Sequence, residues 1–166
     1  LASASVELVF SNLALQWCEP SRVFAEAARA LTAEGLILFS TFGPDTLMEL
    51  RAAFAEADGA PHVNRFVDMH DLGDALVHAG FADPVMEMER ITLEYDSVLA
   101  VARDLKAIGA VNSLPARARG LPGRHRWQRM TDAYERFRRD GVLPATWEVV
   151  YGHAWKVPPN PGSERP

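Results

Sequence analysis

The sequence Val6-Glu7-Leu8-Val9-Phe10 continues without a break into Ser11-Asn12-Leu13-Ala14-Leu15-Gln16-Trp17. The first five residues are mostly apolar and too few for a helix, which predicts a short buried strand. The next seven are small, amide and aromatic residues, and a helix is expected to begin at Ser21. Because ligands of open α/β sheets bind outside the carboxyl ends of the strands, we expect residues 11–17 to form one wall of a ligand site.

Composition limits the class of protein. The 166 residues are enough for one domain or for part of a larger one, and no apolar run is long enough to span a bilayer. The first 20 residues lack the basic start of a signal peptide. The single cysteine, Cys18, argues against a disulfide framework and favours a reducing cytoplasm. Since the chain begins with a core strand and not with Met, we expect residues 1–157 to be the C-terminal portion of a longer domain.

Charge is distributed unevenly along the chain. Residues 1–115 carry 7 Lys or Arg against 17 Asp or Glu, whereas residues 116–166 carry 10 against 5. The basic part is almost entirely arginine, a side chain suited to phosphate and carboxylate recognition. These arginines form either an ordinary solvated helix face or a docking patch for an acidic partner.

Apolar spacing and turn residues predict the order β-α-β-α-α-β-α-α-β. The strands are expected at residues 6–10, 36–41, 85–95 and 146–157. The helices are expected at 21–33, 97–108 and 123–140, with one more from Asp45 or Thr46 to 57 and another from Asp68 to 79. The second strand is apolar throughout, which is typical of burial on both faces. Thr46 and Glu49 fit a capping box. Two early strands joined by a helix predict an α/β fold with a parallel pair. Residues 158–166 are expected to be a disordered tail.

The usual chemical motifs are missing from the sequence. None of the five histidines is paired with another histidine or a cysteine at ligand spacing, so no metal site is expected. The chain also has no Gly-rich phosphate loop and no G-x-S-x-G elbow, which removes support for kinases and hydrolases.

Polar and aromatic residues instead gather in three expected loops. The first holds Asn12, Gln16 and Trp17, the second Ser40, Thr41 and Phe42, and the third His62, Asn64 and Arg65. Each group alone is as compatible with loop capping as with a site. We expect all three to line one crevice.

Five stretches resemble one enzyme family in the same order. They are residues 8–17 (LVFSNLALQW), 39–47 (FSTFGPDTL), 61–66 (PHVNRF), 104–110 (DLKAIGA) and 145–152 (ATWEVVYG). Together they resemble class I S-adenosylmethionine-dependent methyltransferases, and most of all the malonyl-[acyl-carrier protein] O-methyltransferases of biotin synthesis. The likeness implies the C-terminal part of a Rossmann-like sheet, strands four to seven with the last antiparallel, and a helical insertion. The Gly-rich cofactor loop of such enzymes is absent from these residues.

The resemblance also implies a reaction and a set of site residues. The reaction is methyl transfer from S-adenosylmethionine to the free carboxylate of a malonyl thioester, in the cytoplasm. Cofactor-binding residues would be Ser11, Asn12, Leu13 and Trp17. Substrate-binding residues would be Arg65 as the first choice of cation, Lys106 as the second, and His62, Asn64 and Phe42. No catalytic base or metal is expected.

A partner and two alternatives follow from the same likeness. Acyl-carrier proteins are acidic, so Arg124, Arg126, Arg138 and Arg139 would dock the carrier, with no nucleic-acid or membrane partner. The stretches 45–51, 71–73 and 144–146 also resemble a methyltransferase-fold protein-arginine hydroxylase that assembles complex I. The third possibility is a non-catalytic fragment that binds a partner.

Overall fold

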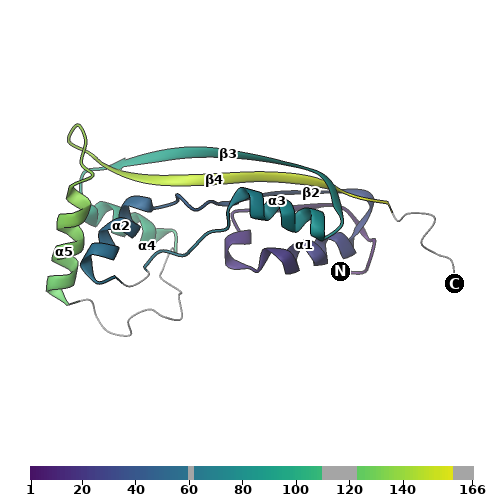
Figure 1. The fold of residues 1–166 in the computed structure, drawn as a ribbon, viewed down its shortest axis with the longest axis horizontal. Helices are drawn as coiled ribbons and strands as arrows, with labels where there is room; N and C mark the ends of the chain where they lie inside the picture. Colours follow the sequence, from purple (N-terminus) through teal and green to yellow (C-terminus); the bar gives the residue numbers. More distant parts are fainter. Residues whose placement is uncertain (60–61, 110–122, 159–166) are drawn as a thin grey trace. The chain divides into compact units, whose positions relative to one another are not determined.

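A computed structural model describes residues 1–59, 62–109 and 123–158, and they form two compact units (Figure 1). The first unit comprises residues 1–43, 66–89 and 149–166, and the second comprises residues 44–65 and 90–148. The position of one unit relative to the other is not determined. Each unit is therefore described by itself.

Four strands form one sheet in the order β1-β2-β4-β3. They are β1 (Val6–Asn12), β2 (Leu31–Phe42), β3 (Phe81–Tyr95) and β4 (Leu143–Lys156). Strand β2 pairs with β1 in parallel, from Val6↔Leu31 to Asn12↔Ser40, and with β4 in antiparallel fashion, from Leu36↔Trp155 to Phe42↔Val149. The predicted α/β class, the early parallel pair and the antiparallel last strand are confirmed.

The helices follow the predicted order with shifted ends. They are the 3-10 turn η1 (Leu15–Trp17), α1 (Pro20–Ala30), α2 (Met48–Ala57), α3 (Met69–His78), α4 (Val98–Ala107) and α5 (Arg124–Glu135). Asp68 and Ser97 cap α3 and α4 as their side chains predict, accepting hydrogen bonds from the backbone N–H groups of His70 and Ala100. The predicted link at 110–122 and all but the first residue of the predicted tail lie outside the described residues.

Helix α1 ends earlier than its apolar spacing predicts. Leu31 continues the stripe of Phe24 and Ala27 and is buried with them, but it is the first residue of β2. Leu31 would lie in the same core whether it belonged to the helix or to the strand, so hydrophobic periodicity could not distinguish the two. Gly35, which follows the predicted helix, lies inside β2, where a Cβ would come 2.9 Å from a side-chain carbon of Leu31.

One face of the sheet in the first unit packs against α1 and α3 (Figure 1). Its core includes Ile37 and Phe39 from β2, and Phe24 and Leu72 from the two helices. On the opposite face Leu8, Phe10 and Leu38 are exposed, whereas Leu36 is half-buried and Ser40 is buried, so the expected burial of the second strand on both faces holds only in part among the described residues. The sequence of these strands is apolar on both sides, but described helices cover only one of them.

The second unit has its own buried residues, which come from α2, α4, α5 and the first part of β4. Met130 and Tyr134 of α5 are fully buried, as their spacing predicts. The Tyr134 hydroxyl donates a hydrogen bond of 2.9 Å to the carbonyl of Pro144, and burial raises the pKa of this phenol. Helix α5 ends at Glu135, five residues before its predicted end, so Arg138 and Arg139 lie in the turn that follows it.

Gly152 in β4 has no room for a side chain. A Cβ at this position would lie 2.4 Å from Cζ of Phe39 and 2.8 Å from the sulfur of Met86. We predict that Gly152→Ala lowers the free energy of unfolding by about 1–3 kcal/mol, because the Phe39 ring must leave its place in the core. Urea unfolding followed by tryptophan fluorescence measures the loss.

Gly73→Ala in α3 is the matched control. Its Cβ would meet Met86 at an ordinary 3.8 Å, and alanine favours a helix over glycine by about 1 kcal/mol. The control should therefore leave the stability unchanged or raise it. Equal destabilisation by both substitutions would contradict the steric explanation.

Candidate functional site

The loop after β1 is fixed to the end of β2 by one serine hydroxyl. Ser40 Oγ donates a hydrogen bond of 2.5 Å to Oδ1 of Asn12 and accepts one of 3.1 Å from the backbone N–H of Leu13. The Ser40 carbonyl accepts a second bond from the same N–H at 3.1 Å. Leu13 has φ 47°, so the chain turns sharply where β1 ends. This anchoring is the reason that the loop leaves the sheet at a defined place.

Side-chain bonds continue the connection between the two loops. Gln16 Nε2 donates to the carbonyl of Leu13 at 2.6 Å, and its Oε1 lies 3.4 Å from the Thr41 hydroxyl. Phe42 packs edge-on against Phe66, with ring centroids 5.7 Å apart. The first two expected loop groups therefore lie together at the carboxyl ends of β1 and β2.

The four predicted cofactor residues share this loop. Ser11 is half-buried, Asn12 is exposed, and Leu13 and Trp17 expose 36% and 56% of their surface. Exposed apolar and aromatic side chains beside an exposed amide provide a surface for a ligand with both apolar and polar parts. This arrangement fits a binding wall, although binding by these residues stays a prediction.

His62 is held in the second unit by a compact set of contacts. Its ring stacks on Phe54 with centroids 3.8 Å apart, and its Nε2 lies 3.0 Å from both carboxylate oxygens of Asp58. Arg126 reaches the same carboxylate at 3.1 Å. These contacts fix His62 between α2 and the start of α5, which agrees with a role in setting the loop that carries Asn64 and Arg65.

The two candidate cations are both exposed. Arg65 follows the His62 anchor, and Lys106 lies in the last turn of α4. No ion pair of either side chain occurs among residues 1–59, 62–109 and 123–158. Helix α4 is fixed to β3 where the Tyr95 hydroxyl donates a 2.6 Å bond to Asp104, and burial raises the pKa of Tyr95 to about 12. Convergence of His62, Asn64 and Arg65 with the first two loop groups stays a prediction, because they belong to the second unit.

The predicted basic face of α5 is smaller than its sequence implies. Arg126 is only 21% exposed and pairs with Asp58. Arg138 pairs with Glu135, whose pKa is lowered by that hydrogen bond, and also donates to the backbone carbonyls of Asp96 and Gly141. Arg139 donates to the carbonyls of Arg136 and Arg138. Arg124 and Arg129 are exposed, and within the described chain neither forms an ion pair.

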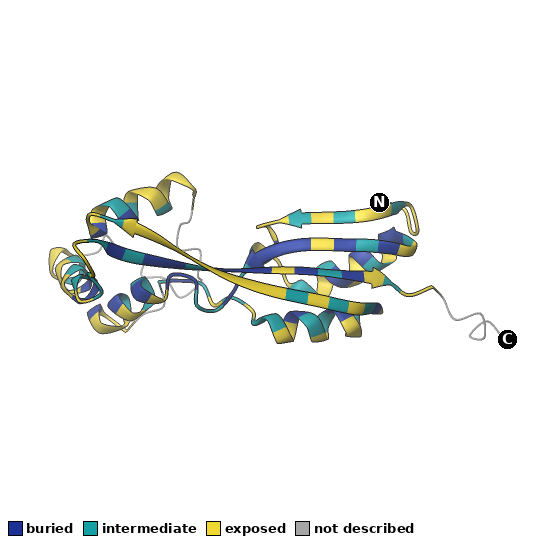
Figure 2. Cartoon of the chain, turned by 90° about the horizontal axis from the view of Figure 1, so that it is seen from above, coloured by how far each residue is buried: buried dark blue, intermediate teal, exposed yellow. Residues whose placement is uncertain are grey.

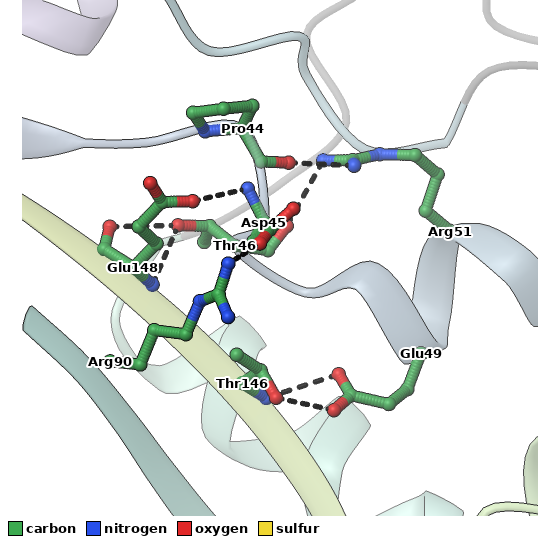
Figure 3. A network of polar contacts seen from close by, with 8 residues as sticks. All are labelled: Pro44, Asp45, Thr46, Glu49, Arg51, Arg90, Thr146 and Glu148. Atoms are coloured by element: carbon green, nitrogen blue, oxygen red, sulfur yellow. Dashed lines mark hydrogen bonds and ion pairs between the residues drawn. The ribbon is translucent and has the colours of Figure 1, made fainter. Parts of the chain in front are cut away.

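A buried polar network anchors the segment between β2 and α2 to β4 (Figure 3). Thr46 exchanges two hydrogen bonds with the backbone of Glu148, at 3.0 and 3.1 Å, and the Glu148 carboxylate accepts one of 2.6 Å from the backbone N–H of Asp45. Arg90 pairs with the Asp45 side chain. Arg51 donates to the carbonyls of Pro44 and Thr46 at 2.8 and 3.0 Å.

Glu49 has a different role from the predicted one. Its two carboxylate oxygens accept hydrogen bonds from the hydroxyl and the backbone N–H of Thr146, at 2.5 and 3.1 Å, and it is 2% exposed. The capping box is therefore wrong: α2 begins after Leu47, and Thr46 and Glu49 both turn toward β4. Both side chains form hydrogen bonds with residues 97 to 102 positions away in the sequence. No local motif could predict these partners.

Two features are absent from the residues that the structure describes. In that part of the chain, no three His, Cys, Asp or Glu side chains come together as a possible metal site. None of its helices combines the length and the apolar character needed to cross a membrane.

Known proteins resemble this chain over nearly all of its length. A methyltransferase-domain family model matches residues 1–39. The malonyl-[acyl-carrier protein] O-methyltransferase of Laribacter hongkongensis is 62% identical over 162 residues, which are 97% of this chain and 54% of that protein. That of Nitrosospira multiformis is 61% identical over 160 residues, or 96% of this chain and 52% of that protein. This chain is similar in sequence to the malonyl-[acyl-carrier protein] O-methyltransferases over nearly all of its own length.

The match confirms the resemblance that residues 8–17 and the later stretches indicate. The chain spans about half the length of the methyltransferases it matches. Solved structures agree on the fold: a protein of Bacillus halodurans assigned as a methyltransferase has a TM-score of 0.56 at 18% identity, covering 95% of this chain and 67% of that one. The YcgJ protein of Bacillus subtilis reaches 0.59 at 11% identity, with the same two coverages.

The buried network predicts an unequal effect of two substitutions in α2. Glu49→Ala leaves the N–H and hydroxyl of Thr146 buried without a partner, and we expect it to lower the free energy of unfolding by about 3 kcal/mol. Glu56→Ala removes an exposed pair with Arg136 and should cost less than about 1 kcal/mol. Thermal unfolding followed by circular dichroism compares them, and a smaller loss for Glu49→Ala would refute the anchoring role.

Proposed function

We propose that this chain belongs to an enzyme that transfers a methyl group from S-adenosylmethionine to the free carboxylate of a malonyl thioester on an acyl-carrier protein. The observation that carries the proposal is the anchored loop at residues 11–17, at the carboxyl ends of two parallel strands, in a chain 62% identical to an enzyme of that name. The proposed location is the cytoplasm, where a single free Cys18 is stable.

The residues of the loop fit the donor's chemistry. A sulfonium is a cation, and the exposed indole of Trp17 offers an aromatic face to it. Leu13 supplies apolar surface beside it, and Ser11 and Asn12 supply polar groups. When bound, S-adenosylmethionine provides the electrophilic methyl carbon.

The reaction requires little from the chain's titratable groups. A malonyl carboxylate is already ionised at neutral pH, so no general base has to remove a proton. One carboxylate oxygen forms a bond to the methyl carbon while the carbon–sulfur bond breaks, and its electron pair remains on sulfur. The products are a methyl ester and S-adenosylhomocysteine. The chain would align the methyl carbon with the carboxylate oxygen and exclude water from them. Phe42 is the residue proposed to cover the pocket.

Arg65 is the proposed binding group for the malonyl carboxylate. It is exposed and follows the His62 anchor, so its guanidinium is available for a bidentate pair. Asn64 and His62 set the loop, and Lys106 is the second candidate cation.

The first experiment assays the complete reading frame that encodes this chain with malonyl-acyl carrier protein, and detects the methyl ester by mass spectrometry. Ester formation would support the proposal. Cofactor binding without an ester would favour the hydroxylase alternative, and neither binding nor ester would favour a non-catalytic fragment.

In the same assay, Arg65→Ala should raise KM for malonyl-acyl carrier protein about 10- to 100-fold, since a charge-assisted hydrogen bond contributes about 1.5–3 kcal/mol. Lys106→Ala should have a smaller effect. Arg22→Ala, an exposed arginine of α1, is the matched control and should leave KM unchanged. An unchanged KM for Arg65→Ala would remove Arg65 from the substrate site.

Carrier docking is proposed for the exposed arginines of α5. Arg124 belongs to the predicted patch and remains part of the proposed docking surface. Arg129 is added to this surface because it is exposed and forms no ion pair among the described residues. Arg126, Arg138 and Arg139 contact other parts of the protein, so they support docking only indirectly.

Charge reversal tests the docking surface. Arg124→Glu and Arg129→Glu should each weaken carrier binding by about 3- to 10-fold at low salt and reduce its salt dependence, with Arg22→Glu as the control of equal charge. Binding is measured by fluorescence anisotropy of labelled carrier. Arg138→Glu should instead lower thermal stability, because it breaks the contact with Glu135. Unchanged binding by both α5 variants would reject this surface.

A further inference from the structure

Two ion pairs join α2 to α5 in the second unit, and they differ in burial. The two helices pack against each other, and each buries one side and exposes the other (Figure 2). Glu56 pairs with Arg136 at the surface, where the two side chains expose 54% and 64% of their area. Asp58, which follows the last residue of α2, pairs with Arg126 at 3.1 Å, and these side chains are only 16% and 21% exposed. The second pair is therefore largely withdrawn from water.

The Asp58 carboxylate holds His62 as well as Arg126. Nε2 of His62 lies 3.0 Å from both carboxylate oxygens, and it is the donor because an ionised carboxylate only accepts. The imidazole ring stacks on Phe54, with centroids 3.8 Å apart. One carboxylate thus binds the first turn of α5 and the loop after α2 at the same time. We call Asp58, His62 and Arg126 the Asp58 cluster.

Stability alone is a poor explanation for the Asp58 cluster. Withdrawing two charged groups from water costs free energy that their attraction often does not recover. Nε of Arg126 is buried and has no hydrogen-bond partner among the described residues, which adds to this cost. The surface pair Glu56–Arg136 joins the same two helices without that cost. We therefore look for the role of the cluster in the position that it fixes.

The Asp58 cluster fixes the start of the segment that carries Arg65. After His62, Val63 is 8% exposed, Asn64 is half-buried and Arg65 is exposed. The chain thus passes from its anchor to the solvent within three residues, a span of at most about 10 Å. A shift of the anchor would displace the Arg65 guanidinium, and bidentate binding of a carboxylate depends on the geometry of that group.

We propose that Asp58 and Arg126 are positioning residues for the substrate carboxylate, acting through His62 on Arg65. The inference rests on the proposed function, in which Arg65 binds the malonyl group. Neither Asp58 nor Arg126 contacts the substrate in this role. Arg126, which the sequence assigns to carrier docking, serves recognition of the malonyl group instead. Loss of the cluster should therefore affect binding of a carrier that bears malonyl and not binding of the same carrier without it.

The test compares the binding of malonyl-acyl carrier protein with that of the carrier lacking malonyl, by fluorescence anisotropy on the protein from the complete reading frame. The unchanged protein should prefer the malonyl form. Asp58→Asn and Arg126→Gln keep the approximate size of each side chain and remove its charge, and each should reduce that preference about 5- to 20-fold. In the methylation assay each should raise KM for malonyl-acyl carrier protein by a similar factor and leave kcat within about twofold. Arg126→Lys keeps the charge and should restore most of the preference.

Glu56→Gln and Arg136→Gln are the matched controls, because they remove the other ion pair between the same helices. They should leave the preference unchanged. Amide hydrogen exchange at residues 62–66 should become faster in Asp58→Asn and Arg126→Gln but not in the controls. Circular dichroism checks the folding of each variant, and Arg126→Gln decides the matter if Asp58→Asn does not fold.

Three results would overturn the positioning role: an unchanged preference in the folded cluster variants, an equal loss in the controls, or no restoration by Arg126→Lys. A different result would overturn the proposed function and the inference with it, namely an unchanged protein that does not distinguish the two carriers. The two failures are therefore seen separately, and the binding readout does not require turnover.

Discussion

The central position of β2 is the constraint on which the first unit depends. It hydrogen-bonds to β1 on one side and to β4 on the other, and its buried side chains Ile37 and Phe39 contact the helical layer. Phe39 lies so close to β4 that a side chain at Gly152 would overlap its ring. Near the end of the same strand, the Ser40 hydroxyl holds the loop after β1. Core packing and the position of the candidate site therefore follow from one strand.

Two kinds of polar contact have different purposes in this protein. Around Thr46, Glu49 and Glu148 the polar groups are buried and bonded to one another, which costs desolvation but fixes the segment after β2 in one place. Around Asn12 and Trp17 the groups are partly exposed and are held by only a few bonds. Within the first unit, Ser40 anchors the loop while Asn12 and Trp17 stay accessible, which is the arrangement that a ligand site needs.

The absence of an acid–base motif in the sequence agrees with the proposed chemistry. Methylation of an ionised carboxylate makes no use of a proton acceptor, so binding and alignment are sufficient. The arginines of this chain lie in two different environments. Arg126 and Arg138 stabilise the fold through Asp58 and Glu135, whereas Arg65, Arg124 and Arg129 keep their charge accessible. Arginines of this chain thus divide between side chains paired within the fold and side chains left exposed.

The sequence by itself determined the order of strands and helices, the N-cap Asp68 and the resemblance to methyltransferases, because hydrophobic periodicity, capping residues and the stretch 8–17 are local features. It misplaced the end of α1, since Leu31 reaches the same core from a helix or a strand. Only the tertiary structure decided that Thr46 and Glu49 bind β4, that Ser40 holds Asn12, and that Arg126 pairs with Asp58. Each of these contacts joins residues 28 to 102 positions apart, and sequence spacing carries no information about such partners.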